Sequence, residues 1–431
     1  MLLQRLHDRT ARIVVLGQGY VGLVLAMRAT EAGFRVVGLD TDRQRTQLLA
    51  AGQSFIEDVP DSVLKAALAA GYRPTSDPDA LGDFDVAVIS VPTPLREGGP
   101  DLSFIEAAAE MLAPRLKQDC LVVLESTTYP GTTEELVAPI LEAGSAEGLL
   151  AGNGFFLGYS PERIDPGNPS FGLENTPKIV AGIDEASLQV TRAFFDAFVS
   201  KTVPVSGCGT AELAKVIENT FRHVNIALVN EIAMFAHDLG IDVSEAIDAA
   251  ATKPFGFMRF TPGPGVGGHC LPIDPTYLSW RVKQHLGESF RFIELANDIN
   301  EHMPHYVVRR VTAALNRDKK AVNGSTIVLL GLSYKPNVAD IREAPSLPII
   351  EQLHAQGAMV STVDPFVDTC SAAGATHHRQ IDLDLLERAD LVVIVTDHDQ
   401  FDYDAVVQRS RRILDTRGRL SESRAEGVER L

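Results

Sequence analysis

The sequence carries a glycine-rich run that is typical of nucleotide-binding turns. The run GQGYVG at 17–22 follows an apolar stretch and precedes a helical pattern, so it lies where a strand turns into a helix. In such a turn Gly17 permits the tight turn of the backbone, Gly19 lets a pyrophosphate approach the backbone, and Gly22 lets the helix and the strand pack closely. Asp40 follows about 20 residues further on, where a carboxylate accepts a hydrogen bond from a ribose 2′-hydroxyl and repels a 2′-phosphate. The pattern predicts NAD rather than NADP as the cofactor; the alternative is that the glycines form only a turn.

A second group of polar residues lies on one predicted helix. Lys215 and Asn219 are four positions apart, so they point the same way, and Arg222 follows along that face. A lysine and an asparagine that converge on a substrate hydroxyl can hold and deprotonate it, or stabilise an oxyanion. The alternative is an ordinary solvated helix face.

The third candidate is a cysteine in a glycine-rich loop. Cys270 lies in GVGGHCLPID, with Gly267 and Gly268 before it and Asp274 after it. Glycines leave space for a ligand, and a thiol among polar groups can attack a carbonyl carbon. The alternative is a small core residue, which we expect for Cys120 inside an apolar strand. His269 is adjacent to Cys270, but adjacent loop residues usually point in different directions.

Two further polar segments follow strand-like runs. They are ESTTYPGTTEE at 125–135 and YSPERIDPG, which contains Glu162. Loops at the carboxyl ends of strands line the ligand crevice of a doubly wound sheet. The alternative is that both are plain polar loops.

The elements that must position these residues follow an alternating pattern. The segment from Arg12 reads as strand, turn, helix and strand, and further strands at 85–94 and 120–127 alternate with a helix at 103–116, which predicts a parallel doubly wound sheet. Residues 209–240 predict one long helix ended by Gly240, and the loop 260–275 is expected to lack regular structure because it is rich in proline and glycine.

The C-terminal part repeats the beginning of the chain weakly. IVLLG near Ser325 resembles IVVLG near Arg12, and AQGAMVSTVD resembles EAGFRVVGLD. The second copy keeps only Gly331 of the three phosphate-turn glycines, so it should bind something other than a dinucleotide. We therefore expect an α/β protein in which two Rossmann-like parallel-sheet domains are joined by a long central helix and a helical middle domain. The expected borders are 1–205 for the NAD-binding domain, 206–320 for the helical linker and dimerisation domain, and 321–431 for the second Rossmann-like domain.

Composition excludes several classes of protein. The 431 residues include 39 basic and 57 acidic side chains, a formal charge of −18 that disfavours nucleic acid as a partner. The four cysteines are widely spaced, so no disulfide framework and no metal site is expected. No apolar run of 18 residues and no signal peptide is present, so we expect a cytoplasmic protein with no membrane partner.

Taken together, these segments resemble the nucleotide-sugar 6-dehydrogenases, the UDP-glucose/UDP-N-acetylhexosamine dehydrogenase family. The resemblance extends over almost the whole chain, from GQGYVGL through VPTP, ESTTYPGTT, YSPERIDPGN, AELAKVIENTFRHVNIALVNE, PGPGVGGHCLPIDP and GLSYKPNVADIRE to LDTRG. Eight ordered motifs are far more specific than any one of them.

The resemblance implies roles for individual residues. The implied catalytic residues are Cys270, Lys215, Asn219, Asp274, Glu162 and Thr127. The expected NAD contacts are Gly17, Gly19, Tyr20, Val21, Gly22, Asp40, Arg45, Val91, Pro92, Thr93, Ser126, Thr127 and Arg342. The expected UDP-sugar contacts are Glu162, Arg163, Lys215, Asn219, Lys253, Arg259, Gly265, Gly267, Lys335 and Arg417.

The implied reaction is a four-electron oxidation of a sugar C6 alcohol to a carboxylate, with two NAD used in succession and a covalent adduct on Cys270. The wording of ESTTYPGTTEE and YSPERIDPGN is most similar to the UDP-N-acetylglucosamine branch, with UDP-N-acetylmannosamine, UDP-N-acetylgalactosamine and UDP-glucose as alternatives. In UDP-glucose enzymes an arginine of the neighbouring subunit reaches the substrate, and here either Lys253 or Arg259 could take that part. A homodimer through the central helical domain, or a higher homo-oligomer, is expected. Two rival interpretations are a two-electron β-hydroxyacid-type dehydrogenase, which gives no reason for the third domain, and a non-enzymatic NAD-sensing module.

Overall fold

The structure, a computed structural model, describes residues 1–165, 167–168, 170–268, 270–370, 374–420 and 426–431. His269 lies outside these residues, and the side chain of Cys270 is likewise not described. The chain divides into two compact units, which are described separately: residues 1–218 with 276–287, and residues 219–275 with 288–431.

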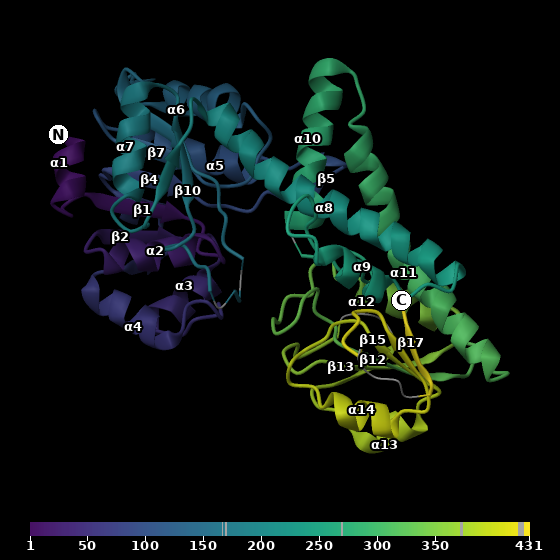
Figure 1. The fold of residues 1–431 in the computed structure, drawn as a ribbon. Coiled ribbons are helices and arrows are strands. Elements are labelled where there is room, and N and C mark those ends of the chain that lie inside the picture. The colour runs from purple at the N-terminus through teal and green to yellow at the C-terminus, as the bar shows by residue number, and fades with distance from the viewer. Residues whose placement is uncertain (166, 169, 269, 371–373, 421–425) are drawn as a thin grey trace. The chain divides into compact units, whose positions relative to one another are not determined.

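The first unit contains a twisted sheet, part of which can be followed in Figure 1. Among the described residues it has nine strands, and their order β11-β10-β9-β7-β4-β1-β2-β3, with β8 beside β9, contains the Rossmann arrangement. All its neighbouring strands are parallel except β9 and β10. Its strands are β1 Arg12–Leu16, β2 Arg35–Leu39, β3 Arg73–Thr75, β4 Val86–Ile89, β7 Leu121–Leu124, β8 Leu150–Ala151, β9 Gly154–Tyr159, β10 Lys178–Gly182 and β11 Thr202–Pro204; a small hairpin joins β5 Leu95–Arg96 to β6 Gly99–Pro100.

Helices cover both faces of this sheet. They are α1 Leu2–His7, α2 Gly22–Glu31, α3 Arg43–Ala50, α4 Asp61–Ala70, α5 Ser103–Leu112, α6 Ala138–Gly144 and α7 Glu185–Phe195, with short helical turns at Pro78–Leu81, Ala113–Arg115 and Thr133–Val137. Alternate residues of β1 enter two different cores: Ile13 and Val15 pack with α2 and α7, whereas Val14 and Leu16 pack with α5 and α6. Leu23, Ala26, Met27 and Thr30, which recur at helical spacing, all lie on the buried face of α2.

The second unit contains a six-stranded sheet, counted over the described residues, in which every neighbouring pair is parallel. The order β14-β13-β12-β15-β16-β17 is again the Rossmann order, which supports the interpretation of an internal repeat. Its strands are β12 Thr326–Leu330, β13 Met359–Val363, β14 Ala375–His378, β15 Leu391–Ile394, β16 Ile413–Asp415 and β17 Val428–Arg430. Its helices are α9 Val243–Ala251, α11 Arg291–Arg317, α12 Ser346–Ala355, α13 Leu383–Arg388 and α14 Tyr403–Arg409. The predicted α/β fold class with two Rossmann-like parallel sheets and a helical middle region is confirmed.

The long helix predicted over 209–240 is α8, Cys208–Asp238, and Gly240 follows it with a left-handed φ of 70°. Its apolar stripe is not in a core of this chain, because Ile217, Leu228, Phe235 and Leu239 are 51 to 73 % exposed. The buried face of α8 carries small and polar residues instead. They include Ala211, Glu212, Lys215, Asn219, His223, Ala227, Asn230 and Ala233.

The expectation that 260–275 lacks regular structure is wrong for its last six residues. Helix α10, Cys270–Leu286, begins inside that segment and contains Pro275. Pro272 lies in the first turn, where a backbone N–H has no partner within the helix, so a proline is tolerated there. Within the described residues, no helix combines the length and apolar character needed to cross a membrane.

Candidate active site

The glycine turn of the first unit has the backbone geometry that a pyrophosphate needs. Gly17 has a φ of +89°, and a Cβ on it would lie 2.2 Å from the carbonyl oxygen of Ser90. A Cβ on Gly22 would lie 2.0 Å from the carbonyl oxygen of Gly17, whereas a Cβ on Gly19 would have nothing within 4 Å. Gly17 and Gly22 are therefore required by packing, and Gly19 faces open space before α2. This cradle fits a dinucleotide phosphate.

Asp40 lies directly after β2 and helps to hold the turn. Its Oδ2 accepts from the backbone N–H of Gln18 at 2.9 Å, and its Oδ1 accepts from that of Asp42 at 2.9 Å. A guanidinium nitrogen of Arg45 lies 3.8 Å from Asp40 Oδ2 and so provides partial neutralisation. Gln18 is buried and accepts a hydrogen bond from the Tyr72 hydroxyl at 2.6 Å. Sequence reasoning missed these two supports, because glutamine and tyrosine carry no motif of their own.

The loops after β4 and β7 are joined through one hydroxyl. Ser126 Oγ accepts from the N–H of Val91 at 2.9 Å and donates to its carbonyl at 2.8 Å. Thr93 is buried, Thr127 is half-buried and Pro92 is exposed. The predicted cofactor contacts of the first unit thus lie at the carboxyl ends of neighbouring parallel strands, where ligands bind in this fold.

Glu162 follows β9 and is almost fully buried. Its Oε1 accepts from the backbone N–H groups of Arg163, at 2.7 Å, and of Ile164. Its Oε2 lies 3.8 Å from Nζ of Lys178. The Arg163 guanidinium forms an ion pair with Glu218 at 2.7 Å, so this predicted substrate contact already has a partner on α8.

Helix α8 carries both Lys215 and Asn219, and each is only 7 % exposed. A solvated helix face is therefore excluded for these two residues, although Arg222 is exposed. The side-chain amide of Asn219 donates to Asp274 Oδ2 at 2.5 Å. Asp274 is fully buried and lies one helical turn after Cys270, the first residue of α10. The structure therefore joins two predicted catalytic residues directly beside the position of a third.

The glycine loop before Cys270 is packed against the second Rossmann-like sheet. Cβ atoms on Gly267 and Gly268 would lie 2.7 Å and 2.9 Å from the side chain of Tyr334. A Cβ on Gly263 would lie 2.9 Å from a guanidinium nitrogen of Arg417. The backbone N–H of Gly268 donates to the Arg342 carbonyl at 2.8 Å. The glycines thus bring the loop against the segments that carry Lys335, Arg342 and Arg417.

Two of the predicted UDP contacts, Lys335 and Arg417, follow strands β12 and β16 at the carboxyl edge of the second sheet. Arg417 follows β16 and donates from Nε to the Val395 carbonyl at 2.7 Å, and it approaches the Tyr334 carbonyl at 3.4 Å. Burial lowers the pKa of this guanidinium, and Asp397 and Asp415 oppose that shift. Lys335 is the residue after Tyr334, so the guanidinium of Arg417 lies near the backbone of the residue that precedes Lys335.

The second sheet repeats the backbone geometry of the first glycine turn, but the position that a dinucleotide would take there is blocked. Gly331 donates to the Val363 carbonyl at 2.8 Å, as Gly17 does to that of Leu39 at 2.8 Å. Asp364 occupies the position of Asp40 and accepts from the backbone N–H groups of Leu332 and Ser333. A ligand cannot reach Asp364 freely, because His398 lies 2.9 Å from it and both side chains are fully buried. This supports the prediction that the second copy does not bind a dinucleotide.

Lys253 and Arg259 are both exposed. Lys253 lies over the ring of Phe255, and Arg259 forms an ion pair with Asp248 at 2.8 Å. Arg342 is half exposed, and its guanidinium contacts Asp340 at 2.6 Å. Nothing in these contacts distinguishes Lys253 from Arg259 as a substrate ligand.

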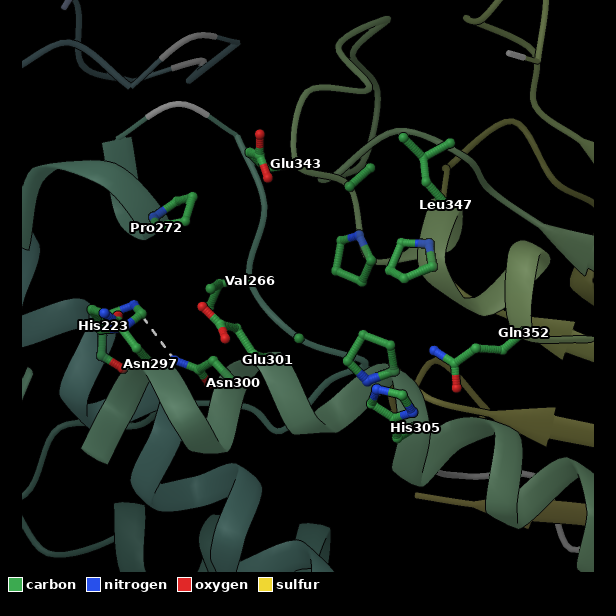
Figure 2. Close-up of a pocket in the computed structure, with 15 residues that line it drawn as sticks. His223, Val266, Pro272, Asn297, Asn300, Glu301, His305, Glu343, Leu347 and Gln352 are labelled. Atoms are coloured by element: carbon green, nitrogen blue, oxygen red, sulfur yellow. Dashed lines mark hydrogen bonds between the residues drawn. The ribbon is translucent and has the colours of Figure 1, made fainter. Parts of the chain in front are cut away.

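A cavity of about 470 Å³ lies in the second unit, between the glycine loop, α11 and the start of α12 (Figure 2). Polar side chains from α8 and α11 face it, and His223 and Asn297 form a hydrogen bond of 2.7 Å on its wall. Gly265 and Pro272 also line it. Among the described lining residues, Lys335 and Arg417 are absent, so the cavity does not unite all the predicted UDP contacts.

Comparisons with known proteins agree along the chain. Three models of the UDP-glucose/GDP-mannose dehydrogenase family match: its NAD binding domain at 11–199, its central domain at 209–302 and its UDP binding domain at 328–422. The chain is 37% identical to a UDP-N-acetyl-D-mannosamine dehydrogenase of Pyrococcus horikoshii over 90% of each chain. It is also 37% identical to a UDP-N-acetyl-D-glucosamine 6-dehydrogenase of Pseudomonas aeruginosa over 85% of each chain. A solved structure of the Pyrococcus horikoshii UDP-D-ManNAc dehydrogenase superposes with a TM-score of 0.88 at 34% identity, over 97% of this chain and 98% of that one.

Proposed function

The chain belongs to the UDP-glucose/GDP-mannose dehydrogenase family and is an NAD-dependent UDP-sugar dehydrogenase; from this premise we propose that it oxidises the C6 alcohol of a UDP-N-acetylhexosamine to the carboxylate. The observation that carries the proposal is the Asn219–Asp274 hydrogen bond, which lies one helical turn from Cys270. Such a buried polar pair beside a nucleophile can orient a hydroxyl or a water.

Cys270 is the proposed nucleophile of the second oxidation. NAD, when bound, accepts a hydride in each of the two oxidations. The Cys270 thiol adds across the aldehyde C=O, its sulfur bonding to the carbon and its proton passing to the oxygen, to give a thiohemiacetal. Loss of that hydroxyl proton and of the second hydride leaves a thioester. A covalent adduct keeps the carbon in place between the two steps, so the aldehyde is not released. The first residue of a helix suits this role, because a helix N-terminus favours negative charge.

The remaining polar residues manage charge and protons. Lys215 as a cation and Asn219 as a donor stabilise the oxyanions that form on the substrate. Asp274 and Glu162 orient water, and Glu162 takes a proton from the water that attacks the thioester carbon. The C–S bond then breaks, the sulfur leaves as a thiolate, and the acid is released.

We propose UDP-N-acetylglucosamine as the substrate, with UDP-N-acetylmannosamine, UDP-N-acetylgalactosamine and UDP-glucose as alternatives. The amino-acid sequences of residues 125–135 and 159–168 support UDP-N-acetylglucosamine. Relatives whose names include N-acetylmannosamine, N-acetylgalactosaminuronic acid and N-acetylglucosamine all match this chain at 36 to 37% identity. The test is NADH production from each UDP-sugar at equal concentration; a kcat/KM that is highest for UDP-glucose would overturn the N-acetylhexosamine assignment.

We further propose that the enzyme is a homodimer through its central helices. The exposed apolar stripe of α8, defined here as Leu213, Ile217, Leu228, Phe235 and Leu239, supports this. Apolar side chains at helical spacing that no core covers are typical of a subunit interface. Light scattering of the purified protein measures the mass directly, and a monomer at micromolar concentration would contradict the proposal.

A further inference from the structure

Three charged side chains meet behind the active-site loops of the first unit. Lys178 is the first residue of β10 and is 2 % exposed. Its Nζ lies 2.5 Å from Oε1 of Glu125, which is fully buried at the end of β7, and 3.8 Å from Oε2 of Glu162. It also donates to the Pro161 carbonyl at 3.1 Å. One ammonium group thus serves two buried carboxylates.

The charges of this cluster do not sum to zero if all three side chains are ionised. Two ionised carboxylates with one ammonium leave a net negative charge on buried groups, which costs several kcal/mol. Proteins avoid that cost by leaving one group neutral. One of the two glutamates therefore carries a proton at neutral pH.

Hydrogen bonding and burial decide which glutamate is neutral. Oε1 of Glu162 accepts from two backbone N–H groups, and such bonds favour the ionised form. The Oε2 atoms of both glutamates are buried and have no hydrogen-bond partner among the described residues, so they do not distinguish the two. Glu125 is the more deeply buried, with 0 % exposure against 9 % for Glu162, so its ionised form is the more costly one. Burial raises the pKa of Glu125, the Lys178 charge opposes this, and the Glu162 charge adds to the rise.

We propose that Glu125 and Lys178 are positioning residues for Glu162: Glu125 stays protonated, and Lys178 serves as the countercharge that keeps Glu162 ionised. The inference rests on the proposed role of Glu162 as the base of thioester hydrolysis. A proton that Glu162 takes from water is returned to solvent after each turnover, so Glu125 keeps its own proton throughout.

The other charged groups around this cluster are already paired. On the loop after β9, the Arg163 guanidinium pairs with Glu218 of α8 at 2.7 Å. Helix α7 contributes the ring of Phe195, whose centroid lies 5.0 Å from Nζ of Lys178. Lys178 is therefore the charge that most directly faces Oε2 of Glu162.

The substitutions Glu125→Gln and Lys178→Met test the proposal through the pH profile of acid formation, measured in a single turnover. Glu125→Gln imitates the protonated side chain, so the acidic limb of the profile and the Tm stay close to the native values. Lys178→Met removes the countercharge, so the limb moves to higher pH by about 1 to 3 units. Lys178→Arg keeps the charge and restores the native limb. Lys117→Met is the matched control. It removes the ion pair between Lys117 and Asp85, the residue before β4, and it should leave the pH profile unchanged.

The infrared carbonyl band of a protonated carboxylic acid provides a second readout that does not depend on activity. At neutral pH this band is present in the native protein and is lost in Glu125→Gln. If Glu125 is instead ionised and paired with Lys178, Glu125→Gln frees the ammonium for Glu162, so the limb moves to lower pH, the Tm falls and no band is lost; that result overturns the proposal. If Lys178→Met does not fold, the Glu125→Gln profile and the infrared band decide alone. Failure of the proposed function is distinguishable, because the native enzyme then forms no acid at all.

Discussion

Asp364 is the strongest electrostatic anchor that we identify in the second unit, and its replacement by asparagine gives a quantitative prediction. Its carboxylate accepts from the backbone N–H groups of Leu332, Ser333, Phe366 and Val367. Burial raises its pKa, but the hydrogen bond from His398 and these backbone bonds outweigh burial and lower the pKa from 3.8 to about 2. An asparagine presents an NH2 group to half of these donors, so Asp364→Asn cannot satisfy them.

The lowered pKa of Asp364 gives the expected size of the change in folding free energy. A folded-state pKa near 2 against an unfolded value near 3.8 corresponds to roughly 2.5 kcal/mol of folding free energy. Because the folded pKa is the lower one, this stability is fully present above pH 4 and is lost as the pH falls toward 2. Asp364→Asn should therefore destabilise the second unit by about 3 to 5 kcal/mol at pH 7, since it also leaves buried donors without acceptors.

Hydrogen exchange of peptides that cover β12 and β13 measures the effect on this unit alone, with β1 peptides as the internal reference. Exchange of the β12 and β13 amides should accelerate in Asp364→Asn, and the difference from the native protein should shrink between pH 4 and pH 2. Asp368→Asn, in an exposed ion pair with Arg379, is the control and should change little. A difference that is independent of pH would refute the assignment of the stability to the Asp364 charge.

Three further predictions concern binding and assembly. Asp40 should make NAD preferred over NADP by at least about 10-fold in kcat/KM, and comparable values for the two cofactors would contradict its role at the ribose 2′-hydroxyl. Lys335→Ala should weaken UDP binding by about 10- to 100-fold in calorimetry with little effect on NAD, because one charge-assisted bond to phosphate is lost; equal losses of both ligands would count against separate sites. Phe235→Glu should shift the mass in light scattering from dimer to monomer, whereas Phe171→Glu, also at an exposed ring, should not; a native-like mass for Phe235→Glu would exclude this face.

Local patterns predicted much of the fold. The turn at 17–22, α2 and the extent of α8 follow from short-range sterics and periodicity, and the parallel, doubly wound character of the sheets follows from the alternation of strands and helices. The start of α10 was missed because its prolines were expected to exclude a helix, whereas α10 has Pro272 in its first turn and also contains Pro275 in its interior. The stripe on α8 was correctly placed on one face, but periodicity alone does not say what covers that face.

Buried charged groups were the least predictable part of the site. Glu125 and Lys178 are 53 positions apart, and only the adjacency of β7, β9 and β10 in the sheet brings them to Glu162. The pair formed by Asp364 and His398 had one usable signal, since the repeat aligns Asp364 with Asp40 at the end of the second strand. Only the structure shows the consequence of this pair, which is that it blocks the position of a dinucleotide.

We propose that one active site carries out two successive oxidations, the second of them through Cys270, and product stoichiometry tests this proposal most directly. The native enzyme, given a limiting amount of UDP-N-acetylglucosamine and excess NAD, should yield two NADH and one acid per sugar with little free aldehyde. Cys270→Ala should lose acid formation by several orders of magnitude while the first hydride transfer survives at some rate. One NADH per sugar from the native enzyme, or carboxylate formed at near-native speed by Cys270→Ala, would contradict the thioester route and return the two-electron interpretation.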